Sequence, residues 1–338
     1  MQTPINSPSP RRLCVIAGDG IGHEVVPMAV QVLLSVLPDI EIVKAEAGWD
    51  CFEHRGVALP EDTFELAKAC GAVLFGAVSS PARKVEGYRS PIVELRRRLA
   101  CYANLRPTVS PQMAGARAGV DLLVVRENTE DLYIGEEHSD GETATATRRI
   151  TRAASLKVAD QAFRLARRRL TIIHKANIMP LTDGLFRDAA RAVSRDYPQI
   201  AVDELLVDAA AYQLAAKPEP FDVLLAPNLY GDILSDLAAV WGGGLGMAPS
   251  LNVGDSAAIA EPVHGSAPDI AGQGVANPVA AILSVALLAR VWWQEHEAAT
   301  RIEQAVSRCL AQGWGTPDVQ PTRVLNTQQL TRQIIALL

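Results

Sequence analysis

Short apolar runs that end in a polar residue or a glycine-rich turn constrain the fold of this chain most strongly. Four such runs lie at 71–78, 120–128, 170–177 and 221–228. Helical periodicity lies around and between them, at 61–70, 91–100, 153–168, 181–195 and 231–240. Because short apolar runs are typical of buried strands, their alternation with helices indicates an α/β protein with a largely parallel sheet.

Three polar side chains follow these predicted strands directly. Arg126 follows "VDLLVV", Lys175 follows "LTIIH" and Asn228 follows "FDVLLAP". An open α/β sheet binds its ligands at the carboxyl ends of its strands. We therefore expect these three side chains to lie at a functional site.

The segment "RLCVIAGDGIGHEVV" predicts a strand, a glycine turn and a helix near the start of the chain. This order invites comparison with the dinucleotide-binding fingerprint G-x-G-x-x-G. Counted from Gly18, the fingerprint requires a glycine where the chain has His23. The segment therefore does not predict a Rossmann fold, and it does not locate a cofactor.

Composition excludes several classes of protein. A chain of 338 residues can form two domains, and a net charge of −6 argues against binding nucleic acid through bulk electrostatics. Five cysteines without a CxxC pair indicate a reducing cytoplasm rather than a disulfide framework. The first 12 residues lack the apolar segment of a secretory signal and predict a short disordered tail. The apolar stretch 279–293 is too short to span a membrane and predicts a buried helix.

The stretch "NLYGDILSDLAAVWGGGLG", residues 228–246, places two aspartates four residues apart. In a helix Asp232 and Asp236 lie on one face, where their charges repel unless a cation lies between them. A hard divalent cation prefers such oxygen ligands. Alternatively, Asp232 caps the helix and Asp236 is an ordinary solvated residue. These residues alone leave both interpretations open.

Three arginines point to an anionic ligand. Arg96, Arg106 and Arg126 come from separate parts of the chain, and guanidinium groups bind carboxylates in a bidentate manner. Several arginines in one pocket would indicate a substrate with several carboxylates. Taken singly, each arginine is more simply a structural or surface residue.

Three further residues could take part in chemistry. Lys175 could act as a base if it lies in a dry or cationic environment, although a lysine at a strand end is commonly a surface residue. Tyr133 could be a general acid or a core aromatic residue. Asp208 ends another apolar run and could supply a third carboxylate to a metal ion.

Together these motifs resemble the β-decarboxylating dehydrogenases, the family of isocitrate, isopropylmalate, homoisocitrate and tartrate dehydrogenases. The resemblance covers nearly the whole chain. The motifs that carry it are "GDGIGHEV", "NLRP", "VRENTEDLY", "HKANIMPLTDGLF", "NLYGDILSDLAA" and "EPVHGSAPDIAGQGVANP". The last two are highly specific, so the family is identified by this ordered series.

The resemblance implies a role for each candidate residue. Asp232 and Asp236 would bind Mg²⁺ or Mn²⁺, with Asp208 supplied by a neighbouring subunit. Lys175, also from the neighbour, would take the hydroxyl proton, and Tyr133 would protonate the product carbon. The implied substrate contacts are Ser90, Arg96, Arg106, Arg126 and Asn177. The implied cofactor contacts are His264, Gly265, Ser266, Ala267, Asp269, Ile270 and Asn277.

The cofactor loop favours NAD over NADP. The carboxylate of Asp269 can accept hydrogen bonds from both ribose hydroxyls, whereas it would repel a 2′-phosphate. NADP-dependent members of the family that resemble bacterial isocitrate dehydrogenase carry a lysine–tyrosine pair where this chain has Asp269 and Ile270. We therefore predict an NAD-dependent enzyme.

The segment "GYRSPIVELRRRL", residues 87–99, bears on the substrate. Ser90 occupies the position at which isocitrate enzymes bind the distal carboxylate, and the segment is most similar to homoisocitrate dehydrogenases of lysine biosynthesis. Asp131 and Tyr212 depart from the homoisocitrate pattern. We therefore rank the candidate substrates as follows: homoisocitrate first, isocitrate second, and isopropylmalate or tartrate below them. With homoisocitrate the product would be 2-oxoadipate.

The family also implies an architecture and an assembly. Two α/β domains would share an extended mixed sheet, one formed by 1–101 with 247–338 and the other by 102–246, with a possible arm at 135–155. The second domain would form a homodimer, and pairing of dimers stays open. Some family members are non-catalytic regulatory subunits. Such a chain would be expected to have lost a catalytic or metal-binding residue, and this chain retains them all.

Overall fold

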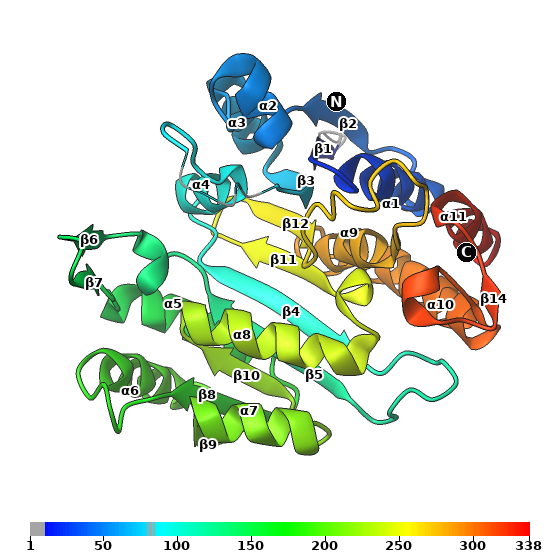
Figure 1. Ribbon diagram of the computed structural model, residues 1–338. Coiled ribbons are helices and arrows are strands. Elements are labelled where there is room, and N and C mark those ends of the chain that lie inside the picture. Colours follow the sequence, from blue (N-terminus) through cyan, green and yellow to red (C-terminus); the bar gives the residue numbers. More distant parts are fainter. Residues whose placement is uncertain (1–10, 80, 82, 84) are drawn as a thin grey trace, which may run out of the picture.

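A ten-stranded sheet runs through the whole molecule (Figure 1). The computed structural model describes residues 11–79, 81, 83 and 85–338, so the predicted N-terminal tail lies outside the described residues except for Arg11 and Arg12. In spatial order the strands are β2 (Glu41–Ala45), β1 (Arg12–Gly18), β3 (Ala72–Ala77), β12 (Ala258–Pro262), β11 (Pro249–Val253), β4 (Ala103–Val109), β5 (Asp121–Glu127), β10 (Val223–Ala226), β8 (Arg169–His174) and β9 (Ala201–Leu206).

The sheet is mixed, which confirms the family architecture, and most of its strand pairs are parallel, as the alternation of strands and helices predicts. The outer strands pair in parallel, from β2 to β12 on one side and from β5 to β9 on the other. The central pairs β12–β11, β11–β4 and β4–β5 are antiparallel. Short connections without a crossover helix join β4 to β5 and β11 to β12, and only antiparallel strands can be joined in that way.

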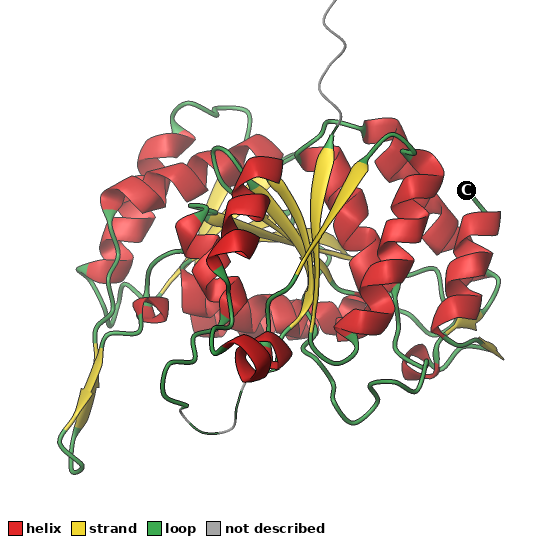
Figure 2. Cartoon of the chain, turned by 90° about the horizontal axis from the view of Figure 1, so that it is seen from above, coloured by secondary structure: helices red, strands yellow, loops and turns green. Residues whose placement is uncertain are grey.

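Helices cover both faces of the sheet (Figures 1 and 2). The α-helices are α1 (Gly22–Val36), α2 (Trp49–Arg55), α3 (Glu61–Cys70), α4 (Pro91–Arg98), α5 (Arg152–Leu165), α6 (Thr182–Ser194), α7 (Val207–Ala216), α8 (Asn228–Ala239), α9 (Val279–Val291), α10 (His296–Ala311) and α11 (Thr327–Ala336). The short elements are η1 (Leu132–Ile134), β6 (Glu137–Ser139), β7 (Ala144–Ala146), η2 (Val240–Gly242), η3 (Leu245–Met247), β13 (Trp314–Gly315), η4 (Pro317–Val319) and β14 (Arg323–Val324).

The two faces of the sheet have different cores. On one face a single apolar cluster continues from α1 and α9 to α5 and α6. On the other face there are two separate clusters, one around α3 and α4 and one around α7 and α8. In β4, Ala103 and Leu105 belong to the continuous core. Successive strand residues point to opposite faces of the sheet, so their neighbours in β4 point to the other face, between the two separate clusters. These residues are Asn104 and Arg106.

Most predicted elements agree with the structure, and α8 differs in an informative way. The helix predicted at 231–240 begins at Asn228, with Pro227 as its N-cap. Asp232 therefore lies inside the helix, and the alternative that it caps the helix is wrong. The stretch predicted as a buried helix, 279–293, forms α9, and no helix of the described residues is long and apolar enough to cross a membrane.

The segment 135–155 contains a two-stranded projection. Strands β6 and β7 pair antiparallel, with Glu137 opposite Ala146, and all of their residues are exposed. The pair extends away from the body of the molecule (Figure 2). We call Glu137–Ala146 the arm.

Strand order separates the chain into two halves of the sheet. Strands β2, β1, β3, β12 and β11 come from residues 12–77 and 249–262, whereas β4, β5, β10, β8 and β9 come from 103–226. The domain boundaries predicted above stay a prediction, and this order is compatible with them. The five cysteines are free thiols and four of them are buried, and burial raises the pKa of Cys14 and Cys101 to about 12.

Candidate active site

The gap between the two separate cores holds a cluster of arginines and carboxylates. Arg126 at the end of β5 lies opposite Asn104 of β4, and Arg106 lies two residues further along β4. Both arginines are buried, at 2% and 7% exposure. Buried guanidinium groups require anionic or polar partners, and α8 provides them.

Arg126 is held on three sides. Its Nε donates to Oδ1 of Asn228 at 2.9 Å, one terminal nitrogen donates to Oδ1 of Asp232, and the guanidinium lies 4.8 Å from the ring centre of Tyr133. Burial and the neighbouring Arg106 lower the pKa of Arg126 to about 10, although Asp232 opposes this shift. The side chain is therefore still a cation at neutral pH.

Arg106 binds one face of α8. Its Nη1 donates to Oγ of Ser235 at 2.8 Å and to Oδ1 of Asp236 at 3.0 Å, and it lies 3.2 Å from Oδ1 of Asp232. Its Nε donates to Oδ1 of Asn104 at 2.7 Å. Residues three and four positions apart share a helix face, which explains why one arginine reaches all three side chains of α8.

The two aspartates of α8 have different protonation tendencies. Burial alone would raise the pKa of Asp232, but Arg126, Arg106 and a hydrogen bond from the Tyr133 hydroxyl outweigh it and hold that pKa below its usual value. Burial and the negative charge of Asp232 raise the pKa of Asp236, against the opposing effect of Arg106. Burial also raises the pKa of Tyr133 above its ordinary value.

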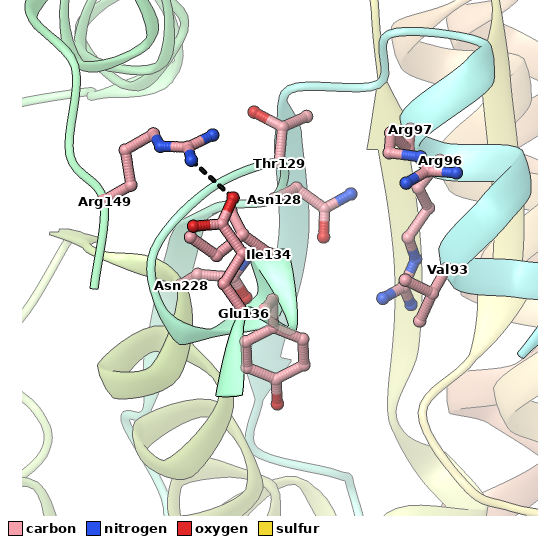
Figure 3. A pocket seen from close by; sticks show the side chains of 10 residues that line it. Val93, Arg96, Arg97, Asn128, Thr129, Ile134, Glu136, Arg149 and Asn228 are labelled. Atoms are coloured by element: carbon pink, nitrogen blue, oxygen red, sulfur yellow. Dashed lines mark hydrogen bonds and ion pairs between the residues drawn. The ribbon is translucent and has the colours of Figure 1, made fainter. Parts of the chain in front are cut away.

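A cavity of about 270 Å³ opens beside this cluster, between α4 and the segment that follows β5. Arg96, Asn128, Tyr133 and Asn228 contribute to its lining. Figure 3 shows Arg96 on the α4 side, across the cavity from Asn228 and from the ion pair of Arg149 with Glu136. The cavity therefore has cationic groups on opposite walls.

Arg96 is not free in this conformation, because it forms a buried ion pair with Glu261 of β12. This pairing with Glu261 holds the guanidinium in one orientation at the edge of the cavity. Ser90 is the N-cap residue of α4, and within the described residues its side chain makes no capping hydrogen bond. The hydroxyl is thus not occupied by its own helix.

Lys175 and Asp208 form a separate pair. Nζ of Lys175 lies 2.5 Å from Oδ1 of Asp208, and this contact lowers the pKa of Asp208. The Asp208 side chain is 67% exposed, and Asn177 lies in the exposed turn after Lys175. Within the described part of one chain no three His, Cys, Asp or Glu residues are placed to hold a metal ion together. One chain alone therefore does not bring Asp208 to Asp232 and Asp236.

The predicted cofactor loop packs against the glycine turn after β1. The Ser266 carbonyl accepts a hydrogen bond from the Ile21 amide at 2.9 Å. A Cβ on Gly20 would lie 2.2 Å from that same carbonyl oxygen, so only glycine permits this approach. The "GDGIG" turn thus supports the loop, although it does not match the dinucleotide fingerprint.

The other residues of this loop differ in exposure. Asp269 and Gly265 are exposed, Ile270 and Ala267 pack partly against the core, and Asn277 is buried. The Asn277 side-chain amide donates to Asp318 at 3.0 Å, so it fixes the loop in this conformation. Burial lowers the pKa of His264 below its ordinary value.

The donor set of α8 fits a hard divalent cation. Asp232 and Asp236 present carboxylate oxygens on one helix face, and their side chains are 32% and 51% exposed, so an ion can reach them. Arg106 and Arg126 occupy some of these oxygens. Both arginines would also be available to the carboxylates of an incoming ligand, because a guanidinium carries several donors.

Sequence reasoning missed the residues that hold the arginines in place. Glu261 pairs with Arg96, Ser235 accepts from Arg106, and Asn104 links Arg106 to Asn252 of β11. Ser235 could have been found, because it follows Asp232 by three residues on the same helix face. Glu261 had no such signal, because its partner is distant in the chain.

Comparison with known proteins identifies the family. The family model described as isocitrate/isopropylmalate dehydrogenase matches residues 12–334. The chain belongs to this family. It is an oxidoreductase, a dehydrogenase that acts on a CH–OH group with decarboxylation. Enzymes of the family generally use NAD or NADP and a divalent metal ion.

Individual relatives carry several substrate names. The isocitrate/homoisocitrate dehydrogenase of Thermus thermophilus is 52% identical over 312 residues, covering 91% of this chain and 93% of the relative. The homoisocitrate dehydrogenase of Methanocaldococcus jannaschii is 46% identical, covering 91% and 92%. The 3-isopropylmalate/3-methylmalate dehydrogenase of the same organism is 45% identical, covering 96% and 97%.

Solved structures share the fold. Isocitrate dehydrogenase from Methylococcus capsulatus superposes with a TM-score of 0.92 at 39% identity, covering 97% of this chain and 99% of that one. A β-decarboxylating dehydrogenase from Thermococcus kodakarensis gives a TM-score of 0.83 at 38% identity, covering 96% and 95%. The isocitrate/isopropylmalate dehydrogenase-like fold predicted from the motifs is confirmed. The relatives carry different substrate names, so the substrate has to be argued from the residues of the site.

Proposed function

We propose that this chain catalyses the NAD- and metal-dependent oxidative decarboxylation of homoisocitrate to 2-oxoadipate, a step of lysine biosynthesis. The observation that carries the proposal is the cluster of Arg106, Arg126, Asp232 and Asp236 beside the cavity that Arg96 lines. Such a cluster can hold a polycarboxylate together with a divalent cation. The Thermus thermophilus relative, named for isocitrate and homoisocitrate, supports the same substrate class.

In this proposal the metal site is completed by two chains. Asp232 and Asp236 of one subunit and Asp208 of a second copy would hold Mg²⁺ or Mn²⁺. The ion supplies charge that lowers the pKa of the substrate hydroxyl, and NAD supplies the hydride acceptor. The exposure of Asp208 supports this arrangement, because its carboxylate is accessible to a second copy and, within the described residues of one chain, does not join Asp232 and Asp236.

The protein side chains would then orient the acid and move its protons. Arg96, Arg106 and Arg126 would hold its carboxylates, and the fixed geometry reduces the entropic cost of reaction. Lys175 of a second copy would accept the hydroxyl proton, and Tyr133 would deliver a proton to the carbon that loses its carboxylate. The contact of the Tyr133 hydroxyl with Asp232 supports this role, since it places the hydroxyl at the α8 carboxylates.

NAD is preferred over NADP in this proposal because of Asp269. Its side chain is exposed on the loop that packs against the "GDGIG" turn, where His264, Gly265, Ser266, Ala267, Ile270 and Asn277 would complete the adenosine contacts. A carboxylate there accepts hydrogen bonds from ribose hydroxyls and repels a 2′-phosphate.

Isocitrate is the second candidate substrate. Ser90 at the N-cap of α4 could donate to the distal carboxylate of either acid, and Asn177 would contribute from the second copy. The solved isocitrate dehydrogenase from Methylococcus capsulatus, with its TM-score of 0.92, favours this alternative. Isopropylmalate ranks lower, because a hydroxyl at position 90 offers no apolar surface to an isopropyl group, and tartrate ranks with it.

A homodimer is the proposed active unit. Large apolar side chains are exposed around the Lys175–Asp208 pair, notably Ile178, Leu181 and Tyr212 at 67%, 86% and 74%. Ile233 of α8 is also 57% exposed. Exposed apolar groups around a predicted intersubunit pair favour a second copy with two-fold symmetry. The free thiols support a location in the reducing cytoplasm.

A substrate panel tests the proposal. The purified chain is assayed with Mn²⁺ and either NAD or NADP, with homoisocitrate, isocitrate, isopropylmalate and tartrate, by absorbance of the reduced nicotinamide. We expect the highest kcat/KM with homoisocitrate and NAD. A higher value with isopropylmalate would overturn the proposed substrate, and turnover of none of these acids would favour a regulatory subunit.

A metal-site variant tests the residue assignment. Asp232→Asn removes a carboxylate charge with little change of volume, so it should weaken Mn²⁺ binding and reduce kcat. The melting temperature should also fall, because the buried guanidinium groups of Arg126 and Arg106 lose an anionic partner. The matched control is Asp188→Asn, because Asp188 is an exposed residue of α6 that pairs with Arg187. Unchanged metal-dependent turnover in Asp232→Asn would remove Asp232 from the proposed ligands.

A further inference from the structure

A buried cluster of three charges lies outside the residues assigned above. Arg148 donates from Nε to Oδ1 of Asp131 and from Nη1 to Oδ1 of Asp183, both at 2.5 Å. The two carboxylates are 0% exposed and the arginine side chain is 12% exposed. The guanidinium also lies 4.8 Å from the ring centre of Tyr230. One cation thus serves two carboxylates that have no access to water.

Each carboxylate uses its second oxygen on a backbone amide. Oδ2 of Asp183 accepts from the amide of Lys175 at 2.5 Å, and Oδ2 of Asp131 accepts from the amide of Leu229 at 3.0 Å. Asp183 lies in the first turn of α6, and Leu229 lies in the first turn of α8. The positive ends of these two helices help to balance the second buried negative charge.

These contacts reach three segments that carry proposed site residues. Lys175 is bound through its own amide. Leu229 is the second residue of α8, which carries Asp232 three residues later. Asp131 lies two residues before Tyr133 and has a φ of +69°. Arg148 itself follows the arm by two residues, and the Asp131 amide donates to the Arg149 carbonyl at 2.8 Å.

We propose that Arg148 is a positioning residue, which through Asp131 and Asp183 fixes Tyr133 and the start of α8 in the site of its own chain and Lys175 for the site of the second copy. The inference rests on the proposed function, because that function gives Lys175, Tyr133 and α8 their roles in the reaction. It also links the arm to the site, since Arg148 follows the arm by two residues and contacts both carboxylates. Neither carboxylate has another side-chain cation as partner within the described residues.

Charge and shape make Arg148 hard to replace. A guanidinium has donors in several directions and can bind two carboxylates at once, whereas an ammonium group is a single point charge. Arg148→Lys should therefore restore part of what Arg148→Met loses. The matched control is Arg164→Met, because Arg164 pairs with Asp160 on the exposed face of α5 and has no hydrogen bond to these segments among the described residues.

Amide hydrogen exchange on the intact, substrate-free protein tests the positioning directly. In Arg148→Met the amides of Lys175 and Leu229 should exchange about tenfold faster or more, whereas the amide of Val125 in β5 should be unchanged. Arg148→Lys should lie between, and Arg164→Met should match the parent chain. Unchanged exchange at Lys175 and Leu229 would overturn the proposal, and equal acceleration at Val125 would show general destabilisation instead.

Kinetics provide the second readout. In Arg148→Met kcat should fall by about 10- to 100-fold, because small displacements of reacting groups have large effects on rate. KM for NAD should not change, since the proposed cofactor loop belongs to the other half of the sheet. A normal kcat together with accelerated exchange would refute a role in the reaction. If the parent chain oxidises no acid, the proposed function fails, while the exchange experiment still decides whether Arg148 positions these segments.

Discussion

The close approach of α8 to β5 gives a sharp test of the site geometry through Gly231→Ala. A Cβ on Gly231 would lie 2.7 Å from both Cβ and Cγ of Arg126 and 3.1 Å from its Cα. Carbon atoms pack at about 3.5–4.0 Å, so the shortfall is roughly 1 Å. Since Cβ and Cα cannot move by a change of rotamer, α8 and β5 must separate.

The energetic terms have opposite signs. Overpacking a buried contact costs about 1–3 kcal/mol, whereas replacing a helical glycine by alanine contributes about 1 kcal/mol of stability. The contact involves atoms close to the main chain of Arg126, which places the cost in the upper part of its range. We therefore expect a net loss of about 1–2 kcal/mol.

Gly184→Ala is the matched control. Gly184 also lies within a helix, α6, but the nearest heavy atom to its added Cβ would be the end of the Arg187 side chain at 4.0 Å. With no clash to oppose the helical preference of alanine, this variant should gain about 0.5–1 kcal/mol. The two substitutions thus differ in sign although their chemistry is the same.

Urea unfolding and steady-state kinetics measure the effect. Gly231→Ala should unfold at lower urea concentration than the parent chain and should lose about 100-fold in kcat/KM, because Asp232 follows the displaced residue directly. Gly184→Ala should unfold at higher urea concentration. If Gly231→Ala is stabilised as much as Gly184→Ala and retains its activity, the packing of α8 against Arg126 is refuted.

Three further predictions follow from buried or exposed charges. Burial alone would raise the pKa of Asp222, but the backbone amides of residues 167–169 and the Arg167 guanidinium outweigh it and lower that pKa. The stabilising effect of the ionised Asp222 is therefore complete above the ordinary aspartate pKa and is lost as the pH falls through the lowered value. Asp222→Asn should reduce the free energy of unfolding by about 1–3 kcal/mol at pH 7 and by less in acid, which urea unfolding at several pH values measures. Asp269→Lys should increase the NADP-to-NAD ratio of kcat/KM by roughly tenfold or more, because the change removes a repulsive charge; an unchanged ratio would contradict the proposed loop. Arg126→Lys should reduce kcat/KM by about 10- to 100-fold, since lysine keeps the charge but loses the planar fork, and equal activity would exclude bidentate binding.

Local sequence signals predicted the secondary structure well where they were complete. The helix predicted at 61–70 has the same bounds as α3. Glu61 and Asp62 favour its first turn, and Gly71 ends it with a φ of +66°. At α8 the same reasoning failed, because Gly231 resembles a boundary. Its actual role is the close approach to Arg126, which is a tertiary requirement that no local pattern expresses.

The candidate site was predictable in part for a similar reason. Asp232 and Asp236 share a helix face, and this follows from spacing alone. The pairing of Arg96 with Glu261 and the cluster around Arg148 depend on strands and loops that are distant in sequence. Spacing carries no information about such contacts, and only the order of the strands brings them together.

The order of strands also has a consequence for synthesis of the chain. Strands β4, β5, β8, β9 and β10 come from one continuous stretch, 103–226, whereas β3 pairs with β12, which is made much later. During synthesis on the ribosome, the edge of β3 that pairs with β12 stays unpaired until residues 258–262 emerge. The middle of the polypeptide can therefore acquire its structure before the beginning does, and contacts of such long range close slowly.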